Sequence, residues 1–369
     1  MKIFRFRQVI PQLYNVIVRR RIEFEFELIP YISEGLSLRK TANFFWFGLN
    51  QFLTPSRPLG IPVIGQVEPV NFCNLSCPLC LTTSQTGSRR RSLLAFSTFK
   101  RFIDEVGDYL LLIVLWNWGE PFLNPDIFRM IRYAKSKNII MHSSTNGNVI
   151  FDEARAEELV DSGLDTLVFG VDGATEETYR KYRKGGSLGN VIESIRTIVK
   201  VKDKVNSKKP FLNLRFVIMK HNEKEIPLIK QLAGDLGVDF LSFKTVDMPA
   251  ARGDDLDSSF APGNPGYRRY EYDQAHKRVG RPFSCMRPWK RITMDALGEI
   301  IPCEYDYKDM HSFGNAGKRS FLREVWKGKK SVEFRKKFNK GFNDYYLCRD
   351  CTYKNRVAED CTIEKIRLR

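Results

Sequence analysis

Between residues 61 and about 246 the chain alternates short apolar runs with longer amphipathic segments. The apolar runs are rich in Val, Ile, Leu and Phe, and they lie near 63–68, 110–116, 138–144, 164–171, 211–219 and 238–244. Segments with helical spacing of apolar residues lie near 97–107, 124–136, 152–162, 175–183, 188–204 and 223–236. Buried parallel strands have this unbroken apolar character. Six strand–helix units therefore predict an α/β fold with a parallel, barrel-like sheet, two units short of a closed eightfold barrel.

The first 60 residues have a different pattern, which is aromatic and basic. The spacing predicts one helix from Phe4 to about Ile29 and a second over about Ser37 to Leu53. The segment from Thr54 to Gly60 is expected to be a linker. Two interpretations of the helices stay open: a cover packed on the barrel, which the pattern slightly favours, or interfacial helices that lie on a membrane surface.

Residues 247–282 predict an irregular connector, and residues 283–369 a small cysteine-rich α+β module with a hairpin turn at 296–298. The expected division is thus a helical, basic extension over 1–60, a core over 61–246, the connector, and the module. Long irregular segments of this kind are often functional.

Composition and charge limit the binding partners and the cellular location that we expect. The net charge of +17 fits an anionic partner or a solvated basic surface, and the even spread of Lys and Arg leaves both open. No signal peptide is evident, and the longest apolar run, Tyr109 to Trp116, has eight residues. A membrane-spanning helix needs about 20. We therefore expect a cytoplasmic chain whose cysteines are reduced or metal-bound.

Three cysteines lie within eight residues, in the spacing C-x3-C-x2-C: Cys73, Cys77 and Cys80. Three thiolates on one short loop can hold three irons of a [4Fe–4S] cluster and leave the fourth iron open for chemistry. Zinc is the main alternative, but a structural zinc site needs four N or S ligands, and no His or further Cys lies near this loop. Disulfide pairing is a weaker alternative, because nothing indicates secretion.

This loop, which follows a strand-like segment, resembles the signature of the radical S-adenosylmethionine (SAM) enzymes. The resemblance implies that the amino and carboxylate groups of SAM chelate the open iron, and that an electron from the cluster breaks a sulfur–carbon bond to give a 5′-deoxyadenosyl radical. Six strand–helix units are also what this family uses, as a partial (β/α)6 TIM-like barrel with SAM at the carboxyl ends of the strands.

Other turns at those strand ends are similar to family motifs. The segment Asn117-Trp118-Gly119-Glu120-Pro121 resembles the G-G-E-P motif, with Trp118 in place of the first glycine. Gly170 stands where relatives often have a serine that touches SAM, so that contact is in doubt here. The resemblance implies that Leu79 packs against the adenine and that Arg183 pairs with the SAM carboxylate. The implied SAM contacts are Leu79, Gly119, Glu120, Pro121, Ser144, Asn146, Asp172 and Arg183.

A second cysteine set occupies the C-terminal module: Cys285, Cys303, Cys348 and Cys351, followed by Cys361. By itself a four-cysteine set is typical of structural zinc. When such a set follows a radical SAM core in the sequence, the order of its cysteines resembles that of the auxiliary-cluster modules called SPASM and twitch. The full SPASM module has more cysteines after the C-x2-C pair, so the resemblance implies one auxiliary [4Fe–4S] cluster held by the first four. Cys361 is then spare, or it substitutes for one of these ligands.

The resemblance implies a radical SAM oxidoreductase or modifying enzyme. We expect a net oxidation, a dehydrogenation or a cross-link, in which the auxiliary cluster accepts an electron. The expected substrate is an anionic sugar or a lipid-linked small molecule, and a flavodoxin or ferredoxin is the expected reductant. A peptide-modifying maturase is the alternative, disfavoured because no winged-helix domain is evident. Contact with the inner membrane face through residues 1–55 is a further expectation.

One alternative belongs to another class: a basic, zinc-bearing protein that binds nucleic acid without catalysis. It predicts zinc in the cysteine sites and no SAM cleavage. We do not expect a nucleic-acid partner. No residue is assigned as a catalytic base from the sequence.

Overall fold

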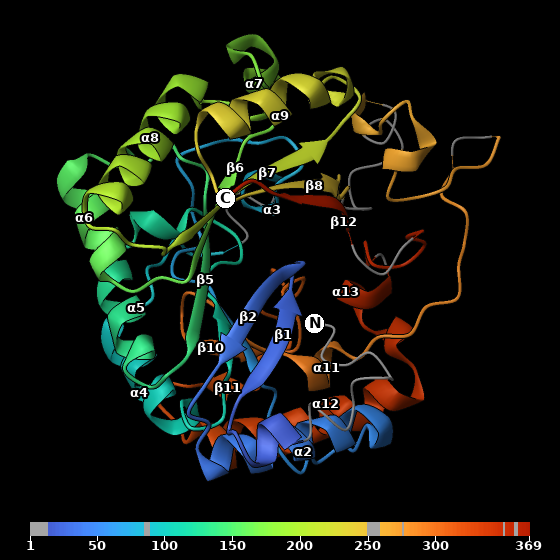
Figure 1. Ribbon diagram of the computed structural model, residues 1–369. Coiled ribbons are helices and arrows are strands. Elements are labelled where there is room, and N and C mark those ends of the chain that lie inside the picture. Colours follow the sequence, from blue (N-terminus) through green and yellow to red (C-terminus); the bar gives the residue numbers. More distant parts are fainter. Residues whose placement is uncertain (1–13, 85–88, 249–258, 275–276, 350, 358–360) are drawn as a thin grey trace.

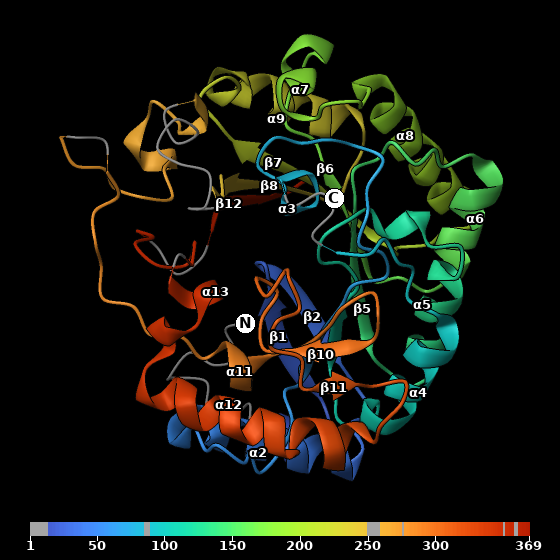
Figure 2. The ribbon, with the colours of Figure 1, turned by 180° about the vertical axis from the view of Figure 1, so that it is seen from behind.

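The fold is built on one curved sheet. The computed structural model describes residues 14–84, 89–248, 259–274, 277–349, 351–357 and 361–369. Within these residues the sheet has ten strands in the order β11-β10-β9-β3-β4-β5-β6-β7-β8-β12. It curves into an open barrel, with the helices on its outer face (Figures 1 and 2). We call the space on its concave side the barrel interior.

All six predicted strands and all six predicted helices are present, and two of the helices lie between the fourth and the fifth strand. The strands are β3 (Ile64–Val67), β4 (Leu112–Val114), β5 (Ile140–Thr145), β6 (Thr166–Gly170), β7 (Phe211–Ile218) and β8 (Phe240–Thr245). The helices are α4 (Phe96–Val106), α5 (Ile127–Lys135), α6 (Glu153–Asp161), α7 (Glu176–Tyr182), α8 (Leu188–Lys204) and α9 (Ile226–Asp235). Neighbouring strands from β3 to β8 pair in parallel. The predicted partial (β/α)6 barrel is therefore confirmed.

Short elements complete the turns of this core. They are α3 (Leu81–Ser84) after the first cysteine loop and the 3-10 helices η2 (Pro121–Leu123) and η3 (Glu223–Glu225). The main apolar core lies between sheet and helices and includes Phe99, Phe169 and Ile195, which are fully buried. Burial of this layer is what fixes the carboxyl ends of the strands at one edge of the sheet.

The predicted helix from Phe4 to Ile29 is wrong where it can be checked. Residues 1–13 lie outside the described residues, residues 14–17 form one helical turn, and the rest is a hairpin of β1 (Ile22–Phe26) and β2 (Ile29–Ser33). Apolar and acidic residues alternate in β1, which gives a period of two rather than 3.6. Glu27 and Leu28 form the turn with φ of 51° and 61°, the left-handed pair that a tight hairpin turn requires.

This hairpin lies inside the curve of the barrel sheet, as both views show (Figures 1 and 2). Its buried side chains, among them Phe24, Phe26 and Tyr31, join inward-facing residues of the barrel in a second apolar cluster. The Tyr31 hydroxyl lies 2.6 Å from His142 Nδ1 and 2.8 Å from Thr166 Oγ1. The N-terminal extension is therefore part of the barrel's inner lining.

The second predicted helix is confirmed as α2 (Leu38–Leu53), which Ser37 caps by accepting a hydrogen bond from the Lys40 amide. Helix α2 runs along the edge of the molecule beside α12 (Figures 1 and 2). In the part of the chain that the structure describes, no helix is long and apolar enough to cross a membrane.

The C-terminal module extends the barrel sheet at both edges. Strand β9 pairs in parallel with β3, and β12 pairs antiparallel with β8. The predicted turn at 296–298 joins β9 to β10, with Gly298 at φ 83°. The elements are η5 (Pro265–Tyr267), α11 (Arg287–Lys290), β9 (Ile292–Met294), β10 (Glu299–Ile301), β11 (Gly314–Asn315), η6 (Phe321–Trp326), α12 (Lys329–Lys340), η7 (Phe342–Asp344), α13 (Tyr346–Arg349) and β12 (Thr362–Arg367).

Candidate active site and auxiliary cysteine site

The first cysteine loop follows β3 and is tied to a neighbouring loop. Its backbone is held by a hydrogen bond from the Ser76 amide to the Lys184 carbonyl, 2.9 Å, and by a turn from Cys80 to Cys77, 3.1 Å. Burial raises the pKa of Cys73 to about 12 and that of Cys77 to about 11. A thiolate at these positions therefore needs a positive partner, and the iron of a cluster supplies that charge.

Gly119 is required by the way its turn meets this loop. Its φ is +99°, and an added Cβ would lie 2.4 Å from the Val70 carbonyl oxygen and 2.8 Å from that of Phe72. The Glu120 amide donates to the same Phe72 oxygen at 3.0 Å. The G-E-P turn thus packs backbone to backbone against the cysteine loop, which only glycine permits.

The Glu120 carboxylate joins two strand ends. It is 1% exposed, and it accepts hydrogen bonds from the amides of Asn146, at 2.7 Å, and Phe122, at 3.2 Å. Burial raises its pKa to about 7 in spite of these bonds. A carboxylate has room for about four hydrogen bonds, so it can still accept from a bound amino group.

The turn Thr145-Asn146-Gly147, at the end of β5, also meets the cysteine loop. Asn146 Nδ2 lies 3.4 Å from Cys73 Sγ and 2.8 Å from Asn74 Oδ1. Ser144 lies on β5 two residues earlier, and Pro121 begins η2. The structure therefore brings Gly119, Glu120 and Asn146 together at the loop.

Arg183 and Asp172 form a buried ion pair beside the loop. Arg183 Nε donates to Asp172 Oδ2 at 2.6 Å, and Asp172 Oδ1 accepts from the Val217 amide at 2.9 Å. The guanidinium lies over Gly170, where an added Cβ would be 2.2 Å from Arg183 Nη2. The serine of relatives would therefore displace the arginine, which explains the glycine in this chain.

Leu79 is placed differently from the other predicted SAM contacts. It is 3% exposed and packs in a small apolar cluster with Met219, Val246, Met248 and Tyr270. Met219 follows β7, Val246 and Met248 follow β8, and Tyr270 lies in the connector. Leu79 therefore joins the cysteine loop to the C-terminal half.

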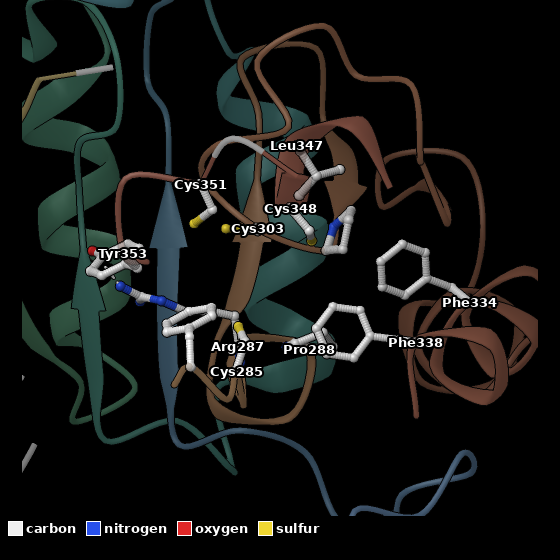
Figure 3. A pocket seen from close by; sticks show the side chains of 12 residues that line it. Cys285, Arg287, Pro288, Cys303, Phe334, Phe338, Leu347, Cys348, Cys351 and Tyr353 are labelled. Atoms are coloured by element: carbon white, nitrogen blue, oxygen red, sulfur yellow. Dashed lines mark hydrogen bonds between the residues drawn. The ribbon is translucent and has the colours of Figure 1, made fainter. Parts of the chain in front are cut away.

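The four predicted auxiliary cysteines line a single cavity. Cys285, Cys303 and the Cys348–Cys351 pair face it from three segments, together with Arg287 (Figure 3). Burial raises the pKa of Cys348 to about 12 and that of Cys351 to about 11. Cys361 is not among the lining residues, and its carbonyl accepts from the Thr245 amide at 2.9 Å.

The number of thiols at the auxiliary site suits a [4Fe–4S] cluster, because each of the four can bind a different iron. The first loop offers three cysteines, one fewer than the four ligands that a structural zinc site needs.

Two family models match the chain. The radical SAM superfamily matches residues 67–232, and the SPASM iron–sulfur cluster-binding domain matches residues 285–352. The chain belongs to the radical SAM superfamily and carries a C-terminal SPASM domain. This radical SAM chain is therefore an enzyme that uses SAM, a SAM-binding [4Fe–4S] cluster and an auxiliary cluster.

Relatives of this radical SAM enzyme modify cofactors or peptides. It is 24% identical over 316 residues to the tungsten-containing aldehyde ferredoxin oxidoreductase cofactor-modifying protein of Pyrococcus furiosus, covering 78% of this chain and 87% of that one. It is 24% identical over 265 residues to the PqqA peptide cyclase of Gluconobacter oxydans, covering 68% and 71%. Its fold resembles that of Streptococcus suis SuiB bound to precursor peptide SuiA, with a TM-score of 0.59, 13% identity, and coverage of 94% and 81%.

Trp118, the departure from G-G-E-P, links the radical SAM core to the SPASM domain. Its indole Nε1 donates to the Glu304 carbonyl at 2.8 Å, next to Cys303. Its ring makes edge contacts with Tyr305 and Tyr307, at centroid distances of 5.9 and 6.2 Å. The sequence did not predict this contact between the domains. The tryptophan that stands in place of the motif's first glycine was the feature that could have indicated it.

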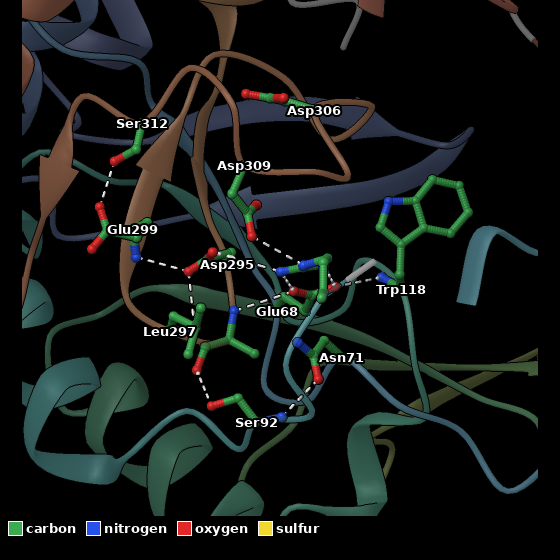
Figure 4. Close-up of polar contacts among 12 residues, drawn as sticks. Glu68, Asn71, Ser92, Trp118, Asp295, Leu297, Glu299, Asp306, Asp309 and Ser312 are labelled. Atoms are coloured by element: carbon green, nitrogen blue, oxygen red, sulfur yellow. Dashed lines mark hydrogen bonds and ion pairs between the residues drawn. The ribbon is translucent and has the colours of Figure 1, made fainter. Parts of the chain in front are cut away.

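The domains are also joined by a cluster of carboxylates, Glu68, Asp295 and Asp309 (Figure 4), which lies around Arg89. Arg89 Nη2 pairs with Glu68 at 2.7 Å, and Nε with Asp309 at 3.1 Å. Asp295 Oδ2 lies 3.6 Å from Arg89 Nη2. Burial and the neighbouring carboxylate raise the pKa of Asp295 to about 8. One proton is therefore shared here at neutral pH, because a single arginine cannot neutralise three carboxylates.

Gly119→Ala is expected to destabilise the enzyme by more than about 1 kcal/mol, because the new Cβ meets backbone atoms at a positive φ. Gly189→Ala in α8 is the matched control, since its Cβ would meet only Ser187 Oγ at 3.5 Å. Urea unfolding and equilibrium SAM binding measure both variants. Wild-type stability and SAM affinity in Gly119→Ala would contradict the close approach.

Asp295→Asn is expected to flatten the pH dependence of stability. The folded carboxyl keeps its proton up to a pKa of about 8, whereas an unfolded Asp releases it near pH 4. Wild-type stability therefore falls as the pH rises between these values, whereas Asn has no proton to lose. At about pH 8.5 the variant should be the more stable by at least about 1 kcal/mol in urea unfolding.

The control for this pH effect is Asp108→Asn, whose side chain is 53% exposed. Its stability curve should run parallel to that of the wild type. If Asp295→Asn were less stable than the wild type at every pH, the shared proton would be ruled out.

Proposed function

We propose that this enzyme carries out a net two-electron oxidation, a dehydrogenation or a cross-link, at an unactivated C–H bond of an anionic sugar or lipid-linked small molecule. When bound, the SAM-binding cluster and SAM supply the 5′-deoxyadenosyl radical that takes the hydrogen atom. The substrate then loses one electron to the auxiliary site and one proton to the medium. A flavodoxin or ferredoxin is proposed as the source of the initiating electron.

The observation that carries this proposal is the cavity shared by Cys285, Cys303, Cys348 and Cys351. Four thiolates satisfy all four irons of a cube and leave none for a substrate. Such a site can exchange electrons but cannot bind the molecule that reacts. An electron acceptor beside a radical-generating site favours oxidation over a redox-neutral rearrangement.

The chain's own residues are proposed to position SAM. Glu120 accepts hydrogen bonds from the SAM amino group, with Gly119 and Pro121 shaping the turn and Asn146 and Ser144 beside it. Arg183, oriented by Asp172, pairs with the SAM carboxylate, and Leu79 borders the adenine. The support is the convergence of Glu120, Asn146 and Arg183 on the cysteine loop.

A peptide substrate is the second candidate. It is favoured by the resemblance to the PqqA peptide cyclase and to the fold of SuiB with its precursor peptide. Against it, the described N-terminal residues form a hairpin and α2, and no winged helix is found among them. A non-catalytic role in nucleic-acid binding finds no support in the two family matches.

The chemistry can be tested with three cysteine variants of the anaerobically reconstituted protein. The wild type is expected to hold about eight irons and to form 5′-deoxyadenosine from SAM with dithionite. Cys77→Ala should form none. Cys348→Ala should keep SAM cleavage but hold only about four irons, and Cys361→Ala should match the wild type in both measurements. Stoichiometric zinc without 5′-deoxyadenosine in the wild type would overturn the proposal.

We also propose that the enzyme is cytoplasmic and contacts the inner membrane face through α2, within the expected 1–55 segment. The buried side of α2 combines Phe44 and Phe47, which pack in the second apolar cluster, with Lys40, Asn43 and Asn50, whose side chains hydrogen-bond backbone atoms of neighbouring segments. Its outer side is apolar: Phe52 is 86% exposed and Leu38 73%. An apolar face of this kind on a helix marks an interaction surface.

Positive charge next to this face favours an anionic lipid surface. Helix α12 lies beside α2, where Asn339 donates to the Thr54 carbonyl at 2.8 Å. Its Lys329 and Lys340 are exposed, as is Arg39 on α2 itself. Lysines near an anionic surface each contribute about 1 kcal/mol to binding.

Replacing Phe52 and Leu53 with serine should weaken binding to vesicles of phosphatidylglycerol and phosphatidylcholine by about tenfold, because inserted apolar area is lost. The control is Leu297→Ser, which is 42% exposed on the β9–β10 turn. Co-sedimentation measures binding, and light scattering measures the mass of the free protein. Equal binding of both variants would refute the membrane contact. If the wild type and Leu297→Ser are dimers and the α2 variant is a monomer, this face binds a second copy of the chain instead.

A further inference from the structure

The tip of the N-terminal hairpin reaches the edge of the sheet that carries the SAM motifs. Glu27, at the tip, pairs with Arg215 on β7 and with Lys244 on β8, the latter at 2.5 Å. Arg215 is paired in register with Gly170, the last residue of β6. The hairpin therefore spans the barrel interior, and its turn lies level with the carboxyl ends of the strands.

Aromatic rings surround this tip. The Phe26 ring lies 5.3 Å from the His142 ring, which in turn lies 5.0 Å from the ring of Trp116. The Arg215 guanidinium lies 5.9 Å from the Trp116 ring centroid. Burial lowers the pKa of His142, so this side chain is neutral at pH 7 and adds no charge.

A third cation, Arg291, faces the tip from the SPASM side. Its guanidinium lies 5.7 Å from the Phe26 ring centroid, and its Nη1 donates to Gln66 Oε1 at 2.5 Å. Gln66 in turn donates to Asn117 Oδ1 at 3.1 Å, next to the G-E-P turn. No carboxylate of the described residues lies within ion-pair distance of Arg291.

The charges at the tip do not balance. Three cations, Arg215, Lys244 and Arg291, lie around the carboxylate of Glu27. The next carboxylate that acts on Arg291 is Glu304, and it is already paired with Arg287 at 2.8 Å. The carboxylates of Glu68 and Asp309 are engaged by Arg89 instead. Positive charge that is removed from water without a partner is costly, so an arrangement of this kind is stable only when an anion completes it.

The site remains open to a ligand. Glu27, Arg215 and Lys244 keep 19%, 13% and 10% of their side-chain surface exposed, so they border space that solvent reaches. Arginine presents a planar fork that suits carboxylate and phosphate oxygens. We call Glu27, Arg215, Lys244 and Arg291 the hairpin-tip cradle.

We propose that the hairpin-tip cradle binds the anionic group of the substrate, a carboxylate or a phosphate, with Arg291 as its main partner and Glu27 holding the other two cations in place. This inference rests on the proposed function for the existence of a substrate but assigns a site that the radical chemistry does not require. The N-terminal hairpin is thus the floor of the substrate site.

The test measures anion binding by the reconstituted, SAM-bound enzyme rather than turnover. Inorganic phosphate and succinate are the probes, with potassium chloride at equal ionic strength as the blank, and thermal midpoints report binding. Wild-type enzyme should show a saturable rise with at least one probe. Arg291→Gln should weaken the apparent affinity about tenfold or more. Lys200→Gln, at a side chain that is 74% exposed, should match the wild type.

A second measurement separates an anion site from a structural arginine. Without a probe, Arg291→Gln should be at least as stable as the wild type, because it removes an unbalanced buried charge. If Arg291 only supported the fold, its replacement would lower the thermal midpoint of unfolding. If Arg291→Gln does not fold, Arg291→Lys keeps the charge without the fork and should retain a weaker response.

The outcomes distinguish this inference from the proposed function. A response to phosphate alone indicates a phosphorylated substrate, and a response to succinate alone indicates a carboxylate, such as an acidic peptide side chain. No saturable response in the wild type, or an equal response in Arg291→Gln, overturns the cradle. Formation of 5′-deoxyadenosine by the wild type without substrate is measured separately, and its absence would refute the proposed function whatever the anions do.

Discussion

Buried thiolates cannot persist without positive charge beside them, and this constraint organises the molecule. Burial raises the pKa of Cys73, Cys77, Cys348 and Cys351 to about 11 or 12. In the folded chain these cysteine side chains are stable either as neutral thiols or as thiolate ligands of iron. The barrel edge and the SPASM domain each gather such thiols at one place, and the rest of the structure holds those two places together.

The connection between the two cysteine sites is polar and aromatic rather than a simple apolar interface. Trp118 reaches from the SAM motif to the Glu304 carbonyl beside Cys303, and Arg89 joins the segment after the first loop to Asp309. Strand β9 adds to the same sheet as β3. Because β9 is hydrogen-bonded to the strand that precedes the cysteine loop, the SPASM domain cannot move as a separate body without breaking the sheet.

The hairpin adds a third component to this arrangement. It covers the concave side of the sheet with Phe24, Phe26 and Tyr31 and carries one acidic residue, Glu27, to the active-site edge. A partial barrel leaves its inner face open, and the apolar side chains of the hairpin fill that space by packing on inward-facing barrel residues. The N-terminal extension therefore combines an apolar stabilising role with a charged surface inside the barrel.

By itself the sequence determined the parts whose signal is local. The six strands and six helices of the core follow from apolar periodicity, and the cluster chemistry follows from the spacing of Cys73, Cys77 and Cys80, because both depend on neighbours along the chain. The helix predicted to Ile29 failed because an alternation of only five residues in β1 was outweighed by a longer apolar and basic pattern. Only the tertiary structure decided which distant residues meet: Arg183 over Gly170, Trp118 at Glu304, and Glu27 between Arg215 and Lys244. These contacts depend on how the sheet curves and how its strands lie in register, and no local pattern of residues encodes the distance between segments far apart in the chain.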